Sequence, residues 1–196
     1  ALRNAGFSVE FVSENDLIVE VILRRRDDET RVQWFYEEET SRRFFPALDD
    51  PVFGFRLHNA DNAVNKVLCA SRRNSAARDA VDLVNIVERY APLGPLIWAA
   101  SGKAPDMAPP STIRSIRANV FGYAEEEIKA VRMTDGSQME WRRVRETIND
   151  ALEAASEYCD TIAPLDLMGC LFVDVNERPV EADTTSIENG VVSVMA

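Results

Sequence analysis

The hydrophobic pattern changes once along the chain, from strand-like runs to helical spacing. Three early runs alternate apolar with polar residues or are rich in β-branched ones, at 8–12, 17–23 and 31–36. Such runs, bounded by turn residues or charges, are typical of β-strands. We therefore expect an antiparallel meander with a turn at 13–16 and a charged loop at 25–30. Prolines and a glycine over 46–58 predict a loop or short extended connection.

From residue 59 the apolar positions recur every three or four residues, which predicts helices. Two helices are expected between Asn59 and Tyr90, and further ones at 96–100, 112–120 and 125–131. Ser137–Glu140 fits a capping box at the start of the clearest helix, whose apolar stripe begins at Trp141. A short hairpin is predicted near the end, between 169–175 and 179–182.

These elements predict an α+β fold, in which a small antiparallel β-sheet packs on a C-terminal helical bundle. We expect a β-rich part at 1–58, a helical domain at 59–164, and a hairpin with a tail at 165–196. Three strands leave two edges that proteins usually cover, so the sheet is expected to be incomplete. Since the chain opens on Ala1 in what reads as mid-domain sequence, we expect further residues before it.

Composition places the chain among globular proteins, with 46% apolar and 28% charged residues. No apolar run approaches the roughly 20 residues that span a bilayer, so no membrane partner is expected. Three cysteines, Cys69, Cys159 and Cys170, are an odd number without CxxC spacing. They favour a reducing, cytoplasmic location and argue against a disulfide framework or a zinc site. The lone histidine, His58, is interpreted as structural.

The net charge of −11 bears on nucleic-acid binding. Nonspecific binding to DNA needs a basic face that attracts phosphates. An RNA- or DNA-binding module without nucleotide chemistry is therefore a weaker hypothesis than the two developed below.

The most informative chemistry lies on the two helices between Asn59 and Tyr90. Lys66 is on the first of them, and Arg78, Asp79 and Asp82 are on the second, with Arg73 before it. Residues three or four apart are neighbours on a helix, so Asp79 and Asp82 share a face. Lysine and arginine beside two carboxylates suit a phosphate-bearing ligand, with or without a metal. They suit equally an ion-pair network between two helices, and both interpretations stay open.

The sequence Asn65-Lys66-Val67-Leu68-Cys69-Ala70, followed by Arg78-Asp79-Ala80-Val81-Asp82-Leu83, resembles the C-terminal two-thirds of AbiEii-type nucleotidyltransferase-like proteins, a toxin-related family. This resemblance implies binding of a nucleoside triphosphate with Mg²⁺ and transfer of a nucleotidyl group to an acceptor, with RNA as one candidate. It implies catalytic roles for Asp79 and Asp82, and nucleotide contacts for Lys66, Arg73 and Arg78. A homo-oligomer is a further candidate assembly.

The chain also departs from the family pattern. The family implies Gly-Ser followed by Asp-x-Asp, but the one Gly-Ser pair, Gly136-Ser137, lies late and no Asp-x-Asp follows it. The resemblance aligns the third metal-binding acid of the family with Gln33, whose neutral amide replaces a carboxylate poorly. Glu37 is a substitute candidate, and no metal ligand is assigned. Either the acidic motif lies upstream of Ala1, or the lineage has lost catalysis. The alternative function is thus a non-catalytic interaction protein derived from a nucleotidyltransferase.

Overall fold

The computed structural model describes residues 3–16, 18–35, 42–51, 54–104, 106–133 and 135–196. The chain forms two compact units, Ala1–Arg42 and Arg43–Ala196. The described residues combine helices with small antiparallel sheets of two or three strands, so the predicted α+β class is confirmed. The β-rich part expected at 1–58 spans the first unit and the beginning of the second.

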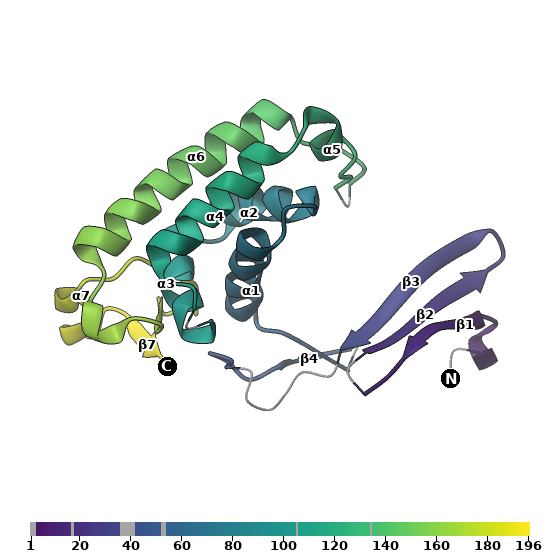
Figure 1. Ribbon diagram of the computed structural model, residues 1–196. Helices are drawn as coiled ribbons and strands as arrows, with labels where there is room; N and C mark the ends of the chain where they lie inside the picture. Colours follow the sequence, from purple (N-terminus) through teal and green to yellow (C-terminus); the bar gives the residue numbers. More distant parts are fainter. Residues whose placement is uncertain (1–2, 17, 36–41, 52–53, 105, 134) are drawn as a thin grey trace. The chain divides into compact units, whose positions relative to one another are not determined.

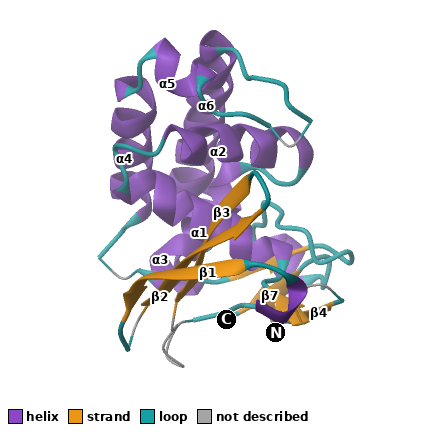
Figure 2. Cartoon of the chain, turned by 90° about the vertical axis from the view of Figure 1, so that its right-hand side faces the viewer, coloured by secondary structure: helices purple, strands orange, loops and turns teal. Residues whose placement is uncertain are grey.

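The first unit is an antiparallel meander, whose strands are orange in Figure 2. A short 3-10 helix, η1 (Arg3–Ala5), precedes β1 (Ser8–Glu14), β2 (Ile18–Arg25) and β3 (Asp28–Phe35). β2 lies in the middle and pairs with both neighbours. The expected meander is therefore confirmed. Leu17 and Tyr36, at the ends of two predicted strands, lie outside the described residues.

The two faces of this meander differ in chemistry. In the register, Val21 pairs with Phe11 on β1 and with Val32 on β3. Val21 is buried, whereas Phe11 and Trp34 on the same face are about half exposed. The opposite face carries ion pairs between neighbouring strands: Arg24–Glu10, Arg24–Glu29 and Arg31–Glu20. Alternation along the strands thus gives one apolar and one charged face.

The predicted charged loop at 25–30 is wrong in extent. β2 continues to Arg25 and β3 starts at Asp28, so only Arg26 and Asp27 form the turn. Arg26 adopts a φ of 57°, in the left-handed region that two-residue hairpin turns use. The charged residues remain in the ladder because opposite charges face each other across the strands.

The second unit is mainly helical, as Figure 1 shows. It begins with a small hairpin of β4 (Leu48–Asp50) and β5 (Gly54–Arg56) within the predicted connection. The helices up to residue 157 are α1 (Asn59–Arg72), α2 (Ala77–Arg89), α3 (Leu93–Lys103), α4 (Pro109–Gly122), α5 (Glu125–Lys129) and α6 (Trp141–Glu157). A π-helical turn, η2 (Tyr158–Ile162), η3 (Leu165–Leu167), β6 (Leu171–Val173), α7 (Thr184–Glu188) and β7 (Ser193–Met195) follow. The predicted helices are thus confirmed, most with longer bounds.

Helix α3 is the centre of the core. All residues from 93 to 100 are buried, and α1, α4, α6 and β6 pack around the helix. A helix that is apolar on every side is stable in water only when other elements cover all of its faces. Trp98 donates its indole N–H to the carbonyl of Leu167 at 3.0 Å. Gly94 lets α3 approach Tyr158 closely, since a Cβ at this glycine would lie 2.7 Å from the tyrosine ring.

A buried ion pair joins α1, α3 and the segment before β4. Asp61 is 1% exposed and accepts the backbone N–H groups of Phe44 and Phe45 at 3.0 and 2.9 Å. The ammonium of Lys103 donates to the same carboxylate at 2.6 Å and to Asn65 at 3.1 Å. Full pairing lets these charges be buried. The sequence patterns did not single out this pair.

His58 is structural, as expected. Its Nδ1 accepts the N–H of Ala60 at the start of α1, its ring stacks on Phe45, and its Nε2 lies 3.1 Å from Glu177.

All three cysteines are free. No described helix combines the length and apolar character that crossing a bilayer requires.

The predicted capping box at Ser137–Glu140 is wrong. Helix α6 is preceded by Glu140, whose side chain makes no capping bond. The backbone N–H and hydroxyl of Ser137 both bond to Asp135. A local turn of this kind competes with helix capping.

The predicted C-terminal hairpin is confirmed only in part. Val180 does donate to the carbonyl of Phe172, and Val173 bridges Pro179. However, the strand that pairs with β6 in register is β7, which lies in a region without a strong sequence pattern.

Candidate functional site

The predicted cation and carboxylates meet between α1 and α2. Lys66 projects from α1, and its ammonium lies 2.5 Å from Asp82 Oδ2 and 3.7 Å from Asp79 Oδ1. Arg73 lies 3.7 Å from the other oxygen of Asp79. We call these four residues, Lys66, Arg73, Asp79 and Asp82, the α1–α2 ion-pair cluster. Helical spacing placed Asp79 and Asp82 on one face, as expected.

Burial differs strongly within this cluster. The side chain of Asp79 is 4% exposed, whereas those of Lys66 and Asp82 are 26% and 32% exposed. Asp79 lies in the first turn of α2, where the helix dipole favours a negative charge. Its Oδ2 is buried without a hydrogen bond and depends on the Arg73 charge. The cluster therefore fastens α1 to α2, which is the ion-pair interpretation of the pattern.

Arg72 and Arg78 do not join this cluster. Arg72 pairs with Asp106 at 3.3 Å. Arg78 instead lines a neighbouring cavity of about 380 Å³, between α2 and the segment after α5. We call this cavity the arginine pocket. It is lined by Arg78, Val81, Asp82, Asn85, Arg89, Val131, Arg132 and Met133.

The arginine pocket brings together three cations. Within the described part of the chain, none of the three arginines, Arg78, Arg89 and Arg132, has a carboxylate oxygen within 4.0 Å of its guanidinium. The carboxylate in the pocket lining, Asp82, is already engaged by Lys66. The net positive charge of the lining is notable in a chain with a net charge of −11. All three arginines are exposed, so their guanidinium groups are free to donate to an anion bound in the cavity.

One further polar side chain, Asn85, lines this pocket, and one carboxylate, Asp135, lies within electrostatic reach of Arg89. Asn85 donates its amide N–H to the carbonyl of Val81, while its Oδ1 is buried without a partner. Asp135 is close enough for the charge of Arg89 to contribute to its lowered pKa, although bonds from Ser137 are the main cause. Arg89 therefore has a distant counter-charge in Asp135 rather than a direct ion pair.

Sequence reasoning found Arg78 but missed Arg89 and Arg132. Arg89 is at the end of α2, and Arg132 follows α5 along the chain. Only the tertiary contact between α2 and α5 brings them to one cavity. No local spacing rule would have found the pair.

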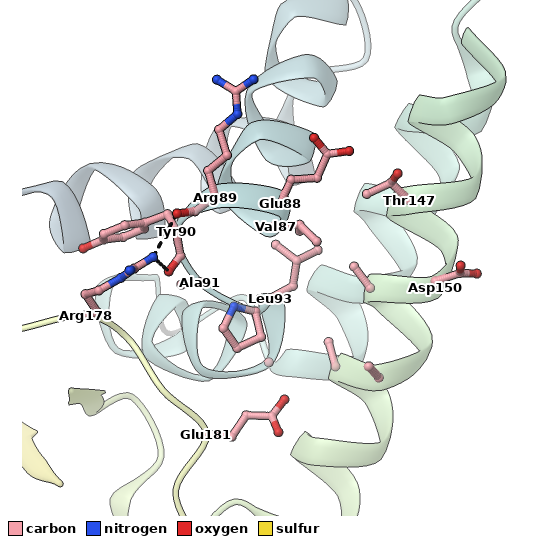
Figure 3. A pocket seen from close by; sticks show the side chains of 15 residues that line it. Val87, Glu88, Arg89, Tyr90, Ala91, Leu93, Thr147, Asp150, Arg178 and Glu181 are labelled. Carbon is pink, nitrogen blue, oxygen red and sulfur yellow. Dashed lines mark hydrogen bonds between the residues drawn. The ribbon is translucent and has the colours of Figure 1, made fainter. Parts of the chain in front are cut away.

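A larger cavity of about 580 Å³ lies where α2 leads into α3 beside α6 (Figure 3). Arg178 is at its edge, but donates to the carbonyls of Arg89 and Tyr90 at 2.9 and 2.7 Å. The carboxylates that line this cavity are Glu88, Asp150 and Glu181, and burial raises the pKa of Glu181. Figure 3 shows the guanidinium of Arg89 extending away from Glu181. This acidic lining is a poor site for an anion.

The structure also bears on metal binding. Among the described residues, no group of three or more His, Cys, Asp or Glu side chains is arranged to hold a metal ion. Gln33, which the resemblance aligns with the third acid of the family, donates to Glu20 within the meander. Glu37, its substitute candidate, lies outside the described residues.

Comparison with known proteins found no counterpart. No family model, no curated protein and no solved structure matches the chain. The resemblance to AbiEii-type proteins, and the catalytic roles that it implies for Asp79 and Asp82, therefore stay predictions.

Proposed function

We propose that the second unit binds a nucleoside triphosphate, with its phosphate groups in the arginine pocket. The observation that carries this proposal is the set of three arginines without carboxylate partners around one cavity, Arg78, Arg89 and Arg132. Guanidinium groups bond phosphate oxygens in a bidentate manner, which makes arginine a preferred phosphate ligand. The nucleoside part of the ligand follows from the family resemblance alone.

The α1–α2 ion-pair cluster has a supporting role in this proposal. Lys66 contacts Asp82 at 2.5 Å and neutralises much of its charge. This carboxylate therefore repels a phosphate in the pocket less than a free carboxylate would. Arg73 and Asp79 fix the start of α2, on which Arg78 stands. We thus assign phosphate contact to Arg78, and positioning to Lys66 and Arg73.

A second candidate is a non-catalytic interaction protein, in which the nucleotide would be a regulator or absent. It is favoured by one observation: both predicted catalytic carboxylates, Asp79 and Asp82, are held by cations of the same chain. Nucleotidyl transfer to RNA or another acceptor would need carboxylates that are free to hold metal ions. We therefore propose ligand binding and assign no transfer step to Asp79 and Asp82.

Isothermal titration calorimetry with ATP, CTP, GTP, UTP and inorganic triphosphate tests the proposal. We expect at least one nucleotide to bind, and Arg89→Ala and Arg132→Ala each to weaken binding about tenfold, because each removes a charged hydrogen bond. Arg114→Ala is the matched control, since Arg114 is exposed on α4 and away from the pocket lining. The nucleotide affinity of the Arg114→Ala variant should equal that of the wild type.

Two results would reject the proposal. One is the absence of binding by every nucleotide and by triphosphate. The other is binding that the pocket variants leave intact, which would place the ligand elsewhere on the chain. Triphosphate binding as tight as that of the nucleotides would show that the base contributes little.

A further inference from the structure

Resting on the proposed function, we infer that the ligand is bound as a metal-free polyphosphate, with the Lys66 ammonium where a divalent ion would bridge Asp79 and Asp82. The resemblance implies Mg²⁺ together with the nucleotide, and the pattern of Lys66, Asp79 and Asp82 suits a phosphate-bearing ligand with or without a metal. The contacts of this pair show whether that ion fits.

The carboxylate pair does not fit Mg²⁺. This ion needs near-octahedral oxygen ligands at about 2.0–2.1 Å. One oxygen of Asp82 already contacts Lys66 at 2.5 Å, and each oxygen of Asp79 faces a cation at 3.7 Å, Lys66 on one side and Arg73 on the other. A divalent ion bridging the two carboxylates would stand against the ammonium and would be repelled by it. Displacing Lys66 would also leave a partly buried ammonium without its partners.

The arginine pocket supplies by itself the charge that a metal would supply. Mg²⁺ in nucleotide sites bridges phosphate oxygens and neutralises their charge. Here Arg78, Arg89 and Arg132 line the cavity and have no carboxylate partner in the described part of the chain. A Mg²⁺ ion on the ligand would cancel part of its negative charge and occupy oxygens that the guanidinium groups would otherwise bond. Magnesium should therefore compete with the pocket rather than assist it.

The test is calorimetry of the wild-type chain with ATP, first in EDTA and then in saturating Mg²⁺. We expect binding in EDTA and an affinity about tenfold lower with Mg²⁺, the loss of roughly one charged hydrogen bond. Equal or tighter binding with Mg²⁺ would overturn the inference but leave the proposed function standing. Absence of binding in both buffers would overturn the proposed function and the inference with it.

A second measurement examines Lys66 without any nucleotide. In Lys66→Met the ammonium is gone and the two carboxylates lose their shared cation. We expect Mn²⁺ to raise the melting temperature of this variant and not that of the wild type, because bound ions stabilise the folded state. Lys129→Met, which removes an exposed partner of Glu125, is the control and should not respond.

A rise in the wild type, or none in a folded Lys66→Met, would contradict the position assigned to the ammonium. If Lys66→Met does not fold, the comparison of EDTA with Mg²⁺ on the wild type still decides.

Discussion

Removing the buried carboxylate of Asp61 should destabilise the second unit more than removing any exposed ion pair. Three donors converge on this side chain: the N–H groups of Phe44 and Phe45 and the ammonium of Lys103. The side chains of Asp61 and Lys103 are 1% and 8% exposed, so water cannot replace the lost acceptor. Breaking such a pair by removing one partner costs about 3–5 kcal/mol. That loss is a large part of the 5–15 kcal/mol by which domains are typically stable.

Urea unfolding followed by circular dichroism measures this loss in Asp61→Ala. Lys103→Met and the double variant complete a mutant cycle, in which the double variant should lose less than the two single losses together. Glu146→Ala is the control, because its pair with Arg142 is well exposed and should be worth about 0.5 kcal/mol or less. Amide exchange at Phe44 and Phe45 gives a local readout and should accelerate in Asp61→Ala. A loss below about 1 kcal/mol with both amides still protected would refute the reasoning.

Three further predictions concern the core and the start of α1. Gly94→Ala should cost about 1–3 kcal/mol, because its Cβ would lie 2.7 Å from the Tyr158 ring; an unchanged melting temperature would contradict this. Burial raises the pKa of Tyr158 and that of the Cys159 thiol, each to about 12. The unfolded chain therefore loses these protons first, and stability should fall as the pH rises from about 9 to 12. Tyr158→Phe should flatten this fall in unfolding measured across that range, and an unaltered slope would exclude Tyr158 as a cause. His58→Ala should cost about 1 kcal/mol by removing the cap of α1, whereas His58→Asn should retain part of it; equal losses in urea unfolding would argue against capping.

The sequence predicted well those features that depend on neighbours along the chain. The meander follows from runs of residues with turns between them, and the meeting of Asp79 with Asp82 follows from one helical turn. The extent of the charged loop was wrong because opposite charges at Arg24 and Glu29 support a strand ladder rather than a turn.

Features formed by distant segments were not predictable in this way. The arginine pocket needs α5 to lie against α2 before Arg132 meets Arg89. The Asp61–Lys103 pair needs α3 beside α1. In both cases a single polar residue carries no signal, since an exposed charge and a buried, paired one look alike in sequence.

The strand pairing of the first unit has a consequence for how the chain folds. Each strand of the meander pairs only with its neighbour in sequence, so every ladder closes a short loop at small entropic cost. The second unit instead joins β6 to β7 and draws Arg178 back to the end of α2. Once β3 has been synthesised, every ladder of the meander has its partner strand, whereas β6 must await the synthesis of β7 near the C-terminus.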